Sequence, residues 1–114
     1  MHELSIAQSI LSIAEAAAPK NNNAEITAIG LQIGELSGIE ISSLEFALSV
    51  IKENTVLHNA KLNIEVIKGE AQCSICNAIF PMNSIGIGCP TCGSYHVNIT
   101  KGREMRVLNL LVDE

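Results

Sequence analysis

Four cysteines form the clearest chemical pattern in this sequence. Cys73 and Cys76 make one C-x2-C pair, Cys89 and Cys92 make a second, and twelve residues separate the pairs. A two-residue gap lets a tight turn bring two thiolates to one metal ion at about 2.3 Å, so two such turns can complete a tetrahedron. Gly93, which follows the second pair, favours a sharp turn. The spacing predicts a closed, structural metal site with four sulfur ligands and no open position for catalysis.

The ion predicted for this site is zinc, which suits four thiolates and needs no redox machinery. Cys-Pro-x-Cys-Gly, as in residues 89–93, also occurs in rubredoxins, so a single iron ion is an alternative. The aromatic cluster around a rubredoxin iron has no counterpart here, because the chain's aromatic residues are only Phe46, Phe80 and Tyr95. A redox-active dithiol is a third interpretation, but two pairs at this spacing exceed what thiol exchange needs.

The first three residues, Met1, His2 and Glu3, carry a second set of donors. The α-amine, the His2 amide nitrogen and the His2 imidazole can chelate one metal ion as fused rings, and the Glu3 amide or carboxylate can supply a fourth donor. Nitrogen donors in one plane suit Ni²⁺ or Cu²⁺. The amide nitrogens are available because the first N–H groups of a helix lack intrahelical partners. The alternative interpretation is an ordinary translational start followed by two polar residues.

Composition argues against several classes of protein. A length of 114 residues suggests one domain, or one domain with a small attached module. The net charge of −5 argues against a nucleic-acid binder, and an aromatic content of 3% removes the stacking platforms of single-strand binders. An apolar content of 47% excludes disorder. The sequence has no phosphate loop, nucleophile–base pair or open zinc site, so we expect no enzymatic activity.

The N-terminal segment does not look like an export signal. No basic residue precedes Leu4, and polar residues interrupt the apolar run that follows. No apolar stretch approaches the roughly 18 residues that a membrane-spanning helix needs. We therefore expect a cytoplasmic protein that does not contact membranes, in which thiols stay reduced and cysteines serve as metal ligands.

Helical periodicity predicts two helices, over residues 4–18 and 43–53. The apolar stripe of the first contains Leu4, Ala7, Leu11, Ala14 and Ala18, widened by Ile10 and Ala17. The buried stripe of the second contains Leu44, Ala47, Leu48 and Ile51, beside Phe46 and Val50. Ser42 and Glu45 have the spacing of a capping box at the start of the second helix.

Strands are predicted over residues 25–33, 61–68 and 103–113, and alternation in the second turns Leu62, Ile64 and Val66 inward. Gly30 and Gly34 suggest a bulge or close approaches of the backbone. The prediction is an α+β fold, in which a small three-stranded sheet with two helices carries an inserted zinc-ribbon module. The first domain would comprise residues 1–70 and 102–114. The module would comprise residues 71–101, with almost no apolar core of its own.

With these residues identified, the chain resembles the HypA/HybF family of hydrogenase maturation proteins, which are nickel metallochaperones. The resemblance runs from Met-His-Glu-Leu-Ser at residues 1–5, through Ile-Gly-Glu-Leu-Ser-Gly at 33–38 and the cysteine pairs, to Gly-Arg-Glu-Met-Arg-Val at 102–107. It covers essentially the whole chain. C-x2-C pairs alone are common, whereas their combination with the N-terminal tripeptide at this length is specific.

The resemblance implies that His2, with Met1 and Glu3, binds Ni²⁺ as a labile cargo, and that the four cysteines bind a structural zinc ion. It implies delivery with a nickel-binding GTPase to the large subunit of nickel–iron hydrogenase, and some members also supply urease maturation proteins. His96 lies where some relatives have a histidine that approaches the nickel, so it is a candidate additional ligand. A homodimer is a further candidate state. Glu35 is either part of a partner surface or a solvated loop carboxylate.

Two functions of other classes compete with nickel delivery. The zinc ribbon could make the chain an adaptor that docks a partner protein or a nucleic acid. With iron in place of zinc, the chain could be a rubredoxin-like electron carrier. A visible spectrum tests the electron carrier, because iron bound to four thiolates is red when oxidised and zinc is colourless. Tight, salt-sensitive binding of DNA or RNA without nickel would favour the adaptor.

Overall fold

The computed structural model describes residues 3–17 and 25–113, so the predicted nickel ligands Met1 and His2 lie outside the described residues. The elements in chain order are α1 (Glu3–Ala17), β1 (Glu25–Gly34), α2 (Ile41–Ile51), β2 (Lys61–Ile67), β3 (Glu70–Cys73), β4 (Ile79–Pro81), β5 (Val97–Lys101) and β6 (Met105–Asp113). Contacts divide the chain into two units. The first unit comprises Met1–Leu31, Ile39–Glu65 and Arg106–Glu114, and the second comprises Gln32–Gly38 and Val66–Met105.

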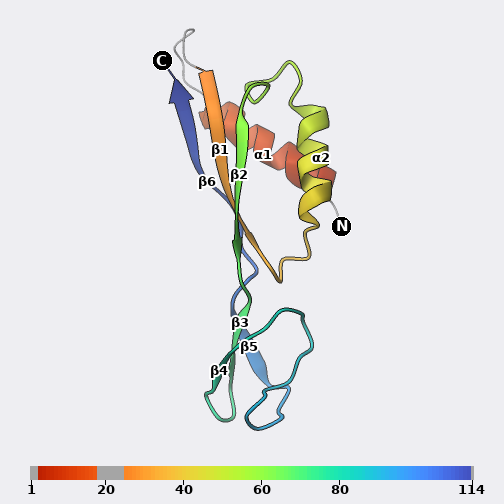
Figure 1. Cartoon of the computed structure of the whole chain (residues 1–114), viewed down its shortest axis with the longest axis vertical. Helices are drawn as coiled ribbons and strands as arrows, with labels where there is room; N and C mark the ends of the chain where they lie inside the picture. Colours follow the sequence, from red (N-terminus) through yellow and green to blue (C-terminus); the bar gives the residue numbers. More distant parts are fainter. Residues whose placement is uncertain (1–2, 18–24, 114) are drawn as a thin grey trace. The chain divides into compact units, whose positions relative to one another are not determined.

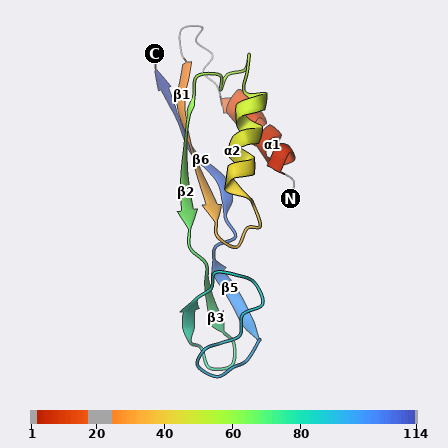
Figure 2. The ribbon, with the colours of Figure 1, turned by 45° about the vertical axis from the view of Figure 1, so that its right-hand side comes forward.

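The sheet β2-β1-β6 has β1 at its centre, and β1 is accordingly the most continuously buried strand, with burial throughout Ala28–Leu31. Figures 1 and 2 show both helices on the same side of this sheet. The fully buried side chains of the first unit include Ile10 of α1, Leu31 of β1 and Leu44 of α2. The core is therefore built from branched aliphatic residues, in agreement with the scarcity of aromatic residues in the sequence.

The buried face of α1 is shifted from the predicted one. Its buried residues are Glu3, Ala7, Ile10 and Ala14. Leu4, predicted to lie on the apolar stripe, is 52% exposed, whereas Ile10 is fully buried. The small side chains of Ala7 and Ala14 allow a close approach between helices, and α1 packs against α2.

α2 begins at Ile41, two residues before the predicted start, and the predicted capping box is wrong. The residue before the helix is Glu40, and no side-chain hydrogen bond caps the first turn. Ser42 Oγ donates instead to the Glu40 carboxylate at 2.9 Å. The Glu40 backbone N–H donates to Glu3 Oε2 at 3.0 Å. A side chain of α1 thus holds the entry into α2, and no local sequence pattern could reveal that contact.

The buried face of α2 contains Leu44, Ala47 and Leu48, as predicted. Phe46 and Val50, which were expected to flank this face, are 70% and 56% exposed. Each helical residue turns by about 100°, so Phe46 lies about 200° from Leu44 and points away from the core.

The edge strand β2 follows its predicted alternation only in part. Leu62 and Ile64 are half-buried, as expected for inward-facing residues. Val66 was also predicted to face inward, but it is 51% exposed. Val66 directly follows Glu65, which is the last residue of β2 that belongs to the first unit.

The second unit is built on the antiparallel sheet β4-β3-β5. Ala71 at its centre lies opposite Phe80 of β4 and Ile99 of β5. Contrary to the expectation of a module with almost no core, this unit has an apolar cluster of Leu36, Ala71, Cys73, Phe80, Met82 and Cys89. Five of these six residues lie within 71–101, so the expectation was wrong for that segment itself, and Leu36 joins them from the loop after β1. By contacts, residues 32–38, 66–70 and 102–105 also group with the cysteine segment.

Three glycines bring backbone segments of the second unit into direct contact. A Cβ at Gly34 would collide with the carbonyl group of Gly102, and a Cβ at Gly69 would collide with the carbonyl oxygen of Met82. Gly102 has a φ of +112°, and a Cβ there would lie 2.7 Å from the Gly69 Cα. The Gly34 N–H donates to the Glu104 carbonyl at 2.7 Å. These contacts confirm the close backbone approach predicted at Gly34.

Glu35 has a defined structural partner. Its Oε1 accepts a hydrogen bond from the Gly69 N–H at 2.8 Å, and its own N–H donates to the Ile67 carbonyl at 2.8 Å. Glu104 Oε1 similarly accepts from the Gly102 N–H at 2.8 Å. Glu35 is exposed in the turn after β1, as expected for a solvated loop carboxylate, and its carboxylate also ties this turn to the segment before β3. A role of Glu35 in a partner surface stays a prediction.

Candidate metal centre

The two C-x2-C pairs fold into two knuckles with the same backbone pattern. In the first, the Asn77 N–H donates to the Cys73 carbonyl at 3.0 Å; in the second, the Gly93 N–H donates to the Cys89 carbonyl at 2.8 Å. Gly93 has a φ of +79° and Asn77 a φ of +64°. The sharp turn predicted at Gly93 is confirmed. The equivalent turn at Asn77 was missed, although asparagine tolerates the left-handed region better than most residues and was its sequence signal.

Each knuckle is closed by hydrogen bonds around its first cysteine. The Cys73 N–H donates to the Ala78 carbonyl at 2.9 Å, and the Cys89 N–H donates to the Ser94 carbonyl at 2.8 Å. Backbone N–H groups also point at the sulfurs, with Ile75 donating to Cys73 Sγ at 3.4 Å. Thr91 donates to Cys89 Sγ at the same distance. Such N–H···S contacts favour the thiolate form that a metal ion requires.

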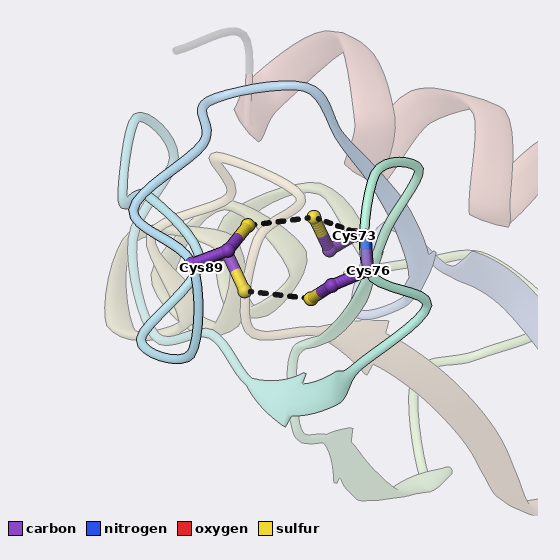
Figure 3. A group of neighbouring side chains, drawn as sticks. Cys73, Cys76 and Cys89 are labelled. Carbon is purple, nitrogen blue, oxygen red and sulfur yellow. Dashed lines mark hydrogen bonds between the residues drawn. The ribbon is translucent and has the colours of Figure 1, made fainter.

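The four sulfurs form one compact group, in which every sulfur lies within 4.8 Å of the others. Cys73 Sγ and Cys92 Sγ are 3.5 Å apart, and Cys76 Sγ and Cys89 Sγ are 3.6 Å apart. Figure 3 shows the labelled cysteines Cys73, Cys76 and Cys89 facing one another from two loops. Four sulfurs at about 2.3 Å from a central ion would be about 3.8 Å apart, so this group fits a tetrahedral ion with little adjustment.

The first cysteine of each pair is stabilised as a thiolate. The Cys92 N–H is the main factor that lowers the pKa of the Cys89 thiol to about 6, against the opposing effect of burial. The pKa of Cys73 is also lowered, chiefly by the Cys76 N–H. Both cysteines are buried, and they belong to the apolar core of the unit.

The second cysteine of each pair keeps its proton more strongly. The Ser94 N–H lowers the pKa of Cys92, but the neighbouring sulfurs and burial outweigh this effect and raise it to about 12. The pKa of Cys76 is raised as well, because burial and the sulfurs of Cys89 and Cys73 outweigh the Ala78 N–H. The second cysteine of each pair therefore favours the protonated thiol in the absence of a cation, and a bound dication would favour the thiolate form of all four.

Of the predicted N-terminal ligands, only Glu3 is described. It is the first residue of α1, it is buried, and its Oε2 accepts the hydrogen bond from the Glu40 N–H. One carboxylate oxygen of Glu3 is thus committed to α2.

The histidines of the described residues lie outside the sulfur group. His96 is exposed, and its carbonyl accepts hydrogen bonds from the Ser74 N–H at 2.9 Å and from Ser74 Oγ at 2.7 Å. These contacts join the segment after the second knuckle to the first. His58 lies in the turn region after α2, where its Nδ1 is 2.8 Å from the Thr55 carbonyl and its Nε2 is 3.4 Å from Glu25 Oε1. Neither imidazole belongs to a group of metal-ligating side chains in the described part of the chain.

No helix within the described residues is both long enough and apolar enough to cross a membrane. Both helices are amphipathic instead, with exposed polar residues opposite their buried stripes.

Comparison with known proteins places this geometry in context. Residues 1–112 match the family model HypA, described as hydrogenase/urease nickel incorporation, metallochaperone. The hydrogenase maturation factor HypA of Parabacteroides distasonis is 46% identical over 112 residues, which cover 98% of this chain and 97% of that protein. The factor of the same name from Polaromonas naphthalenivorans is 39% identical, with the same coverage of both chains.

Solved structures agree with the sequence comparison. The solution structure of a HypA protein matches with a TM-score of 0.67 and 35% identity, covering 96% of this chain and 94% of that one. The solution structure of the nickel metallochaperone HypA from Helicobacter pylori matches with a TM-score of 0.66 and 35% identity, covering 96% of both chains. Together with the four-cysteine group and the α+β architecture, these matches show that the chain belongs to the HypA family of nickel-incorporation metallochaperones.

Proposed function

We propose that this protein carries Ni²⁺ for the maturation of nickel–iron hydrogenase and holds the ion at its N-terminus. The donors are the Met1 α-amine, the His2 amide and imidazole nitrogens, and a group of Glu3. The observation that supports this most directly is family membership over residues 1–112, which includes the N-terminal tripeptide. A site with few protein donors suits a carrier, because it can release its cargo more readily than a buried cage.

For Glu3 we propose the amide nitrogen as the donor. The Glu3 carboxylate is buried and accepts the Glu40 N–H at 3.0 Å, so recruiting it to nickel would compete with that hydrogen bond. The amide nitrogen belongs to the first residue of α1 and directly follows the His2 donors in the chain. Nickel with amine, amide and imidazole nitrogens in one plane is a favourable arrangement.

For the four cysteines we propose structural zinc rather than iron. Zn²⁺ accepts tetrahedral thiolate ligation without a redox requirement, and the site has no open position for substrate. Bound zinc would contribute on the order of 10 kcal/mol to folding of the second unit. Metal analysis of the purified protein, together with its visible spectrum, tests this assignment. A red, iron-containing protein would contradict it.

The delivery partners belong to the same proposal. Nickel would pass, in the cytoplasm and together with a nickel-binding GTPase, to the hydrogenase large subunit, with urease maturation proteins as further recipients and no catalytic step performed by this chain. His96, exposed on the second unit, stays a candidate additional nickel ligand. Nickel-transfer assays with the untagged protein, with and without the GTPase, test delivery directly.

The nickel site itself is tested by a matched pair of substitutions at position 3. Proline at the first helical position is well tolerated but has no amide N–H to deprotonate, whereas alanine keeps it. Both changes remove the carboxylate. We expect Glu3→Ala to retain one equivalent of nickel, and Glu3→Pro and His2→Ala to lose it, in calorimetric titrations of untagged, zinc-loaded protein. Equal nickel binding by Glu3→Ala and Glu3→Pro would contradict the amide donor, and full binding by His2→Ala would contradict the site.

A further inference from the structure

The second unit has an open groove that nickel delivery and zinc binding do not use. Its volume is about 490 Å³, within the range of ligand-binding clefts. The residues that line it include Met82, Ile85, Ile87, Tyr95, Ile99 and Arg103. Ile85 is 63% exposed and Tyr95 75% exposed. Clustered exposed apolar side chains of this kind mark interaction surfaces more often than isolated ones do.

Tyr95 is fixed against the backbone of the second knuckle. A Cβ at Gly88 would lie 3.1 Å from Cε1 and 3.3 Å from Cζ of the Tyr95 ring, so the ring rests where only a glycine leaves room. Gly88 immediately precedes Cys89, and the Tyr95 carbonyl accepts the Val97 N–H at 3.0 Å. An exposed aromatic ring held in this way contributes contact area at little entropic cost, as aromatic residues do at binding hot spots.

The charged side chain that lines the groove is basic. Arg103 lines it, and none of its lining residues is acidic. Among the residues that the structure describes, no carboxylate pairs with the Arg103 side chain; Glu104, the next residue, accepts the Gly102 N–H instead. A ligand with one carboxylate beside aliphatic groups would therefore complement the groove in both charge and polarity.

The backbone at the groove favours an extended ligand. Val97, Asn98 and Ile99 line it, and they belong to β5. β5 pairs with β3 on one side and forms an edge of the β4-β3-β5 sheet. An edge strand can accept a further strand through its unpaired backbone groups, while neighbouring pockets receive alternate side chains.

We propose that this groove binds an extended segment of a partner protein that carries aliphatic side chains and one acidic residue, with the acidic residue at Arg103 and the aliphatic ones on Ile85, Ile87 and Tyr95. The proposal concerns the second unit alone and does not depend on nickel at the N-terminus. Because Tyr95 rests on Gly88 beside the metal-binding Cys89, the groove is available only when the second knuckle is folded.

The test uses two capped peptides as probes, acetyl-Leu-Ile-Asp-Leu-Ile-amide and its counterpart with lysine in place of aspartate. Each is titrated into zinc-loaded, isotope-labelled full-length protein while amide and methyl NMR signals are followed. We expect the aspartate peptide to shift the signals of Ile85, Ile87 and Tyr95 and to bind about tenfold more tightly than the lysine peptide. Arg103→Glu should reverse that preference, and Tyr95→Ala should weaken binding of both peptides.

Ile79→Ala is the matched control, since Ile79 is an exposed isoleucine of the same unit that does not line the groove. This variant should bind as the wild type does. Absence of binding at millimolar peptide, equal affinity for both peptides, an unchanged preference in Arg103→Glu, or an equal loss in Ile79→Ala would overturn the proposal. So would concentration-dependent self-association that protects the groove, because a second copy would then be its occupant. Zinc content is measured for every variant, so that loss of the fold is not mistaken for loss of the site.

Discussion

The Glu3 carboxylate at the start of α1 accepts a hydrogen bond from the backbone N–H of Glu40, the residue that leads into α2, at 3.0 Å. Residues 37 positions apart are thereby joined at the end of the chain where nickel is proposed to bind. A buried acidic side chain at this position is unusual, because acidic residues are almost never buried without partners. The contact gives Glu3 a structural role that is separate from its backbone nitrogen.

This relationship predicts different effects for two substitutions of Glu3. Glu3→Ala leaves the part-buried Glu40 N–H without its acceptor and should cost about 1–3 kcal/mol of unfolding free energy. Glu3→Gln keeps an acceptor oxygen and should cost about 1 kcal/mol or less. Urea unfolding followed by helical circular dichroism measures both, since α1 and α2 provide the helical signal. Equal costs for the two variants would show that the hydrogen bond contributes little.

The glycine contacts of the second unit predict an unequal cost of adding a methyl group. Gly34→Ala would place a Cβ against the backbone of Gly102, where no side chain can move aside, and should destabilise by more than about 3 kcal/mol. Gly86→Ala adds its Cβ in open space and pays only for the left-handed backbone, about 1–2 kcal/mol. Thermal unfolding of the two variants makes the comparison. A smaller shift for Gly34→Ala than for Gly86→Ala would contradict the close packing.

The buried position of Leu36 allows a test of how much the stability of the second unit depends on the loop after β1. Its side chain is buried in the cluster with Phe80 and Met82, so Leu36→Ala should cost about 2–5 kcal/mol. Leu111→Ala, at an exposed position of β6, should cost less than about 1 kcal/mol. Because Cys73 and Cys89 share the Leu36 cluster, we also expect zinc to leave Leu36→Ala faster in a chelator competition. Wild-type release kinetics in that variant would contradict the coupling.

The cysteine pKa values predict proton release on zinc binding. Without metal, the pKa of Cys92 is raised to about 12 and that of Cys76 is also raised, so both keep their protons at pH 7. The pKa of Cys89 is lowered to about 6, so its thiol has already lost its proton there. Zinc binding at pH 7 should therefore release at least two protons, and zinc affinity should rise with pH. Calorimetry in buffers of different ionisation enthalpy counts them.

Cys92→Ser provides the control for this count. Serine does not ionise in this range, so a variant that still binds zinc should release one proton fewer than the wild type. A second variant, Cys89→Ser, should release nearly as many protons on zinc binding as the wild type, because Cys89 is already a thiolate at pH 7. Identical losses in the two variants would contradict the assignment of thiol and thiolate within the pairs.

Much of the chemistry of this protein follows from local sequence. The two C-x2-C pairs determine the sulfur group, because a knuckle is a turn whose geometry is set within a few residues, and the structure confirms that all four sulfurs converge. Helical and strand periodicity likewise predicted the α+β class and most of the buried stripe of α2. The family resemblance, carried by the terminal tripeptide and the pairs, is confirmed over residues 1–112.

Only the tertiary structure decided which residues far apart in the chain contact one another. The capping box at Ser42 failed because α2 already begins at Ile41, so Ser42 lies inside the first turn, and the preceding Glu40 N–H is held by Glu3, far away in sequence. The core of the second unit was underestimated because its buried residues are scattered through residues 71–89 and come together only in the folded unit, where Leu36 joins them. Glu35 and the glycines at 34, 69 and 102 have their partners across long chain separations for the same reason. Local sequence patterns determine turns and the buried faces of helices and strands. A contact between distant residues depends instead on which segments come together in the fold, and no short stretch of sequence contains both partners.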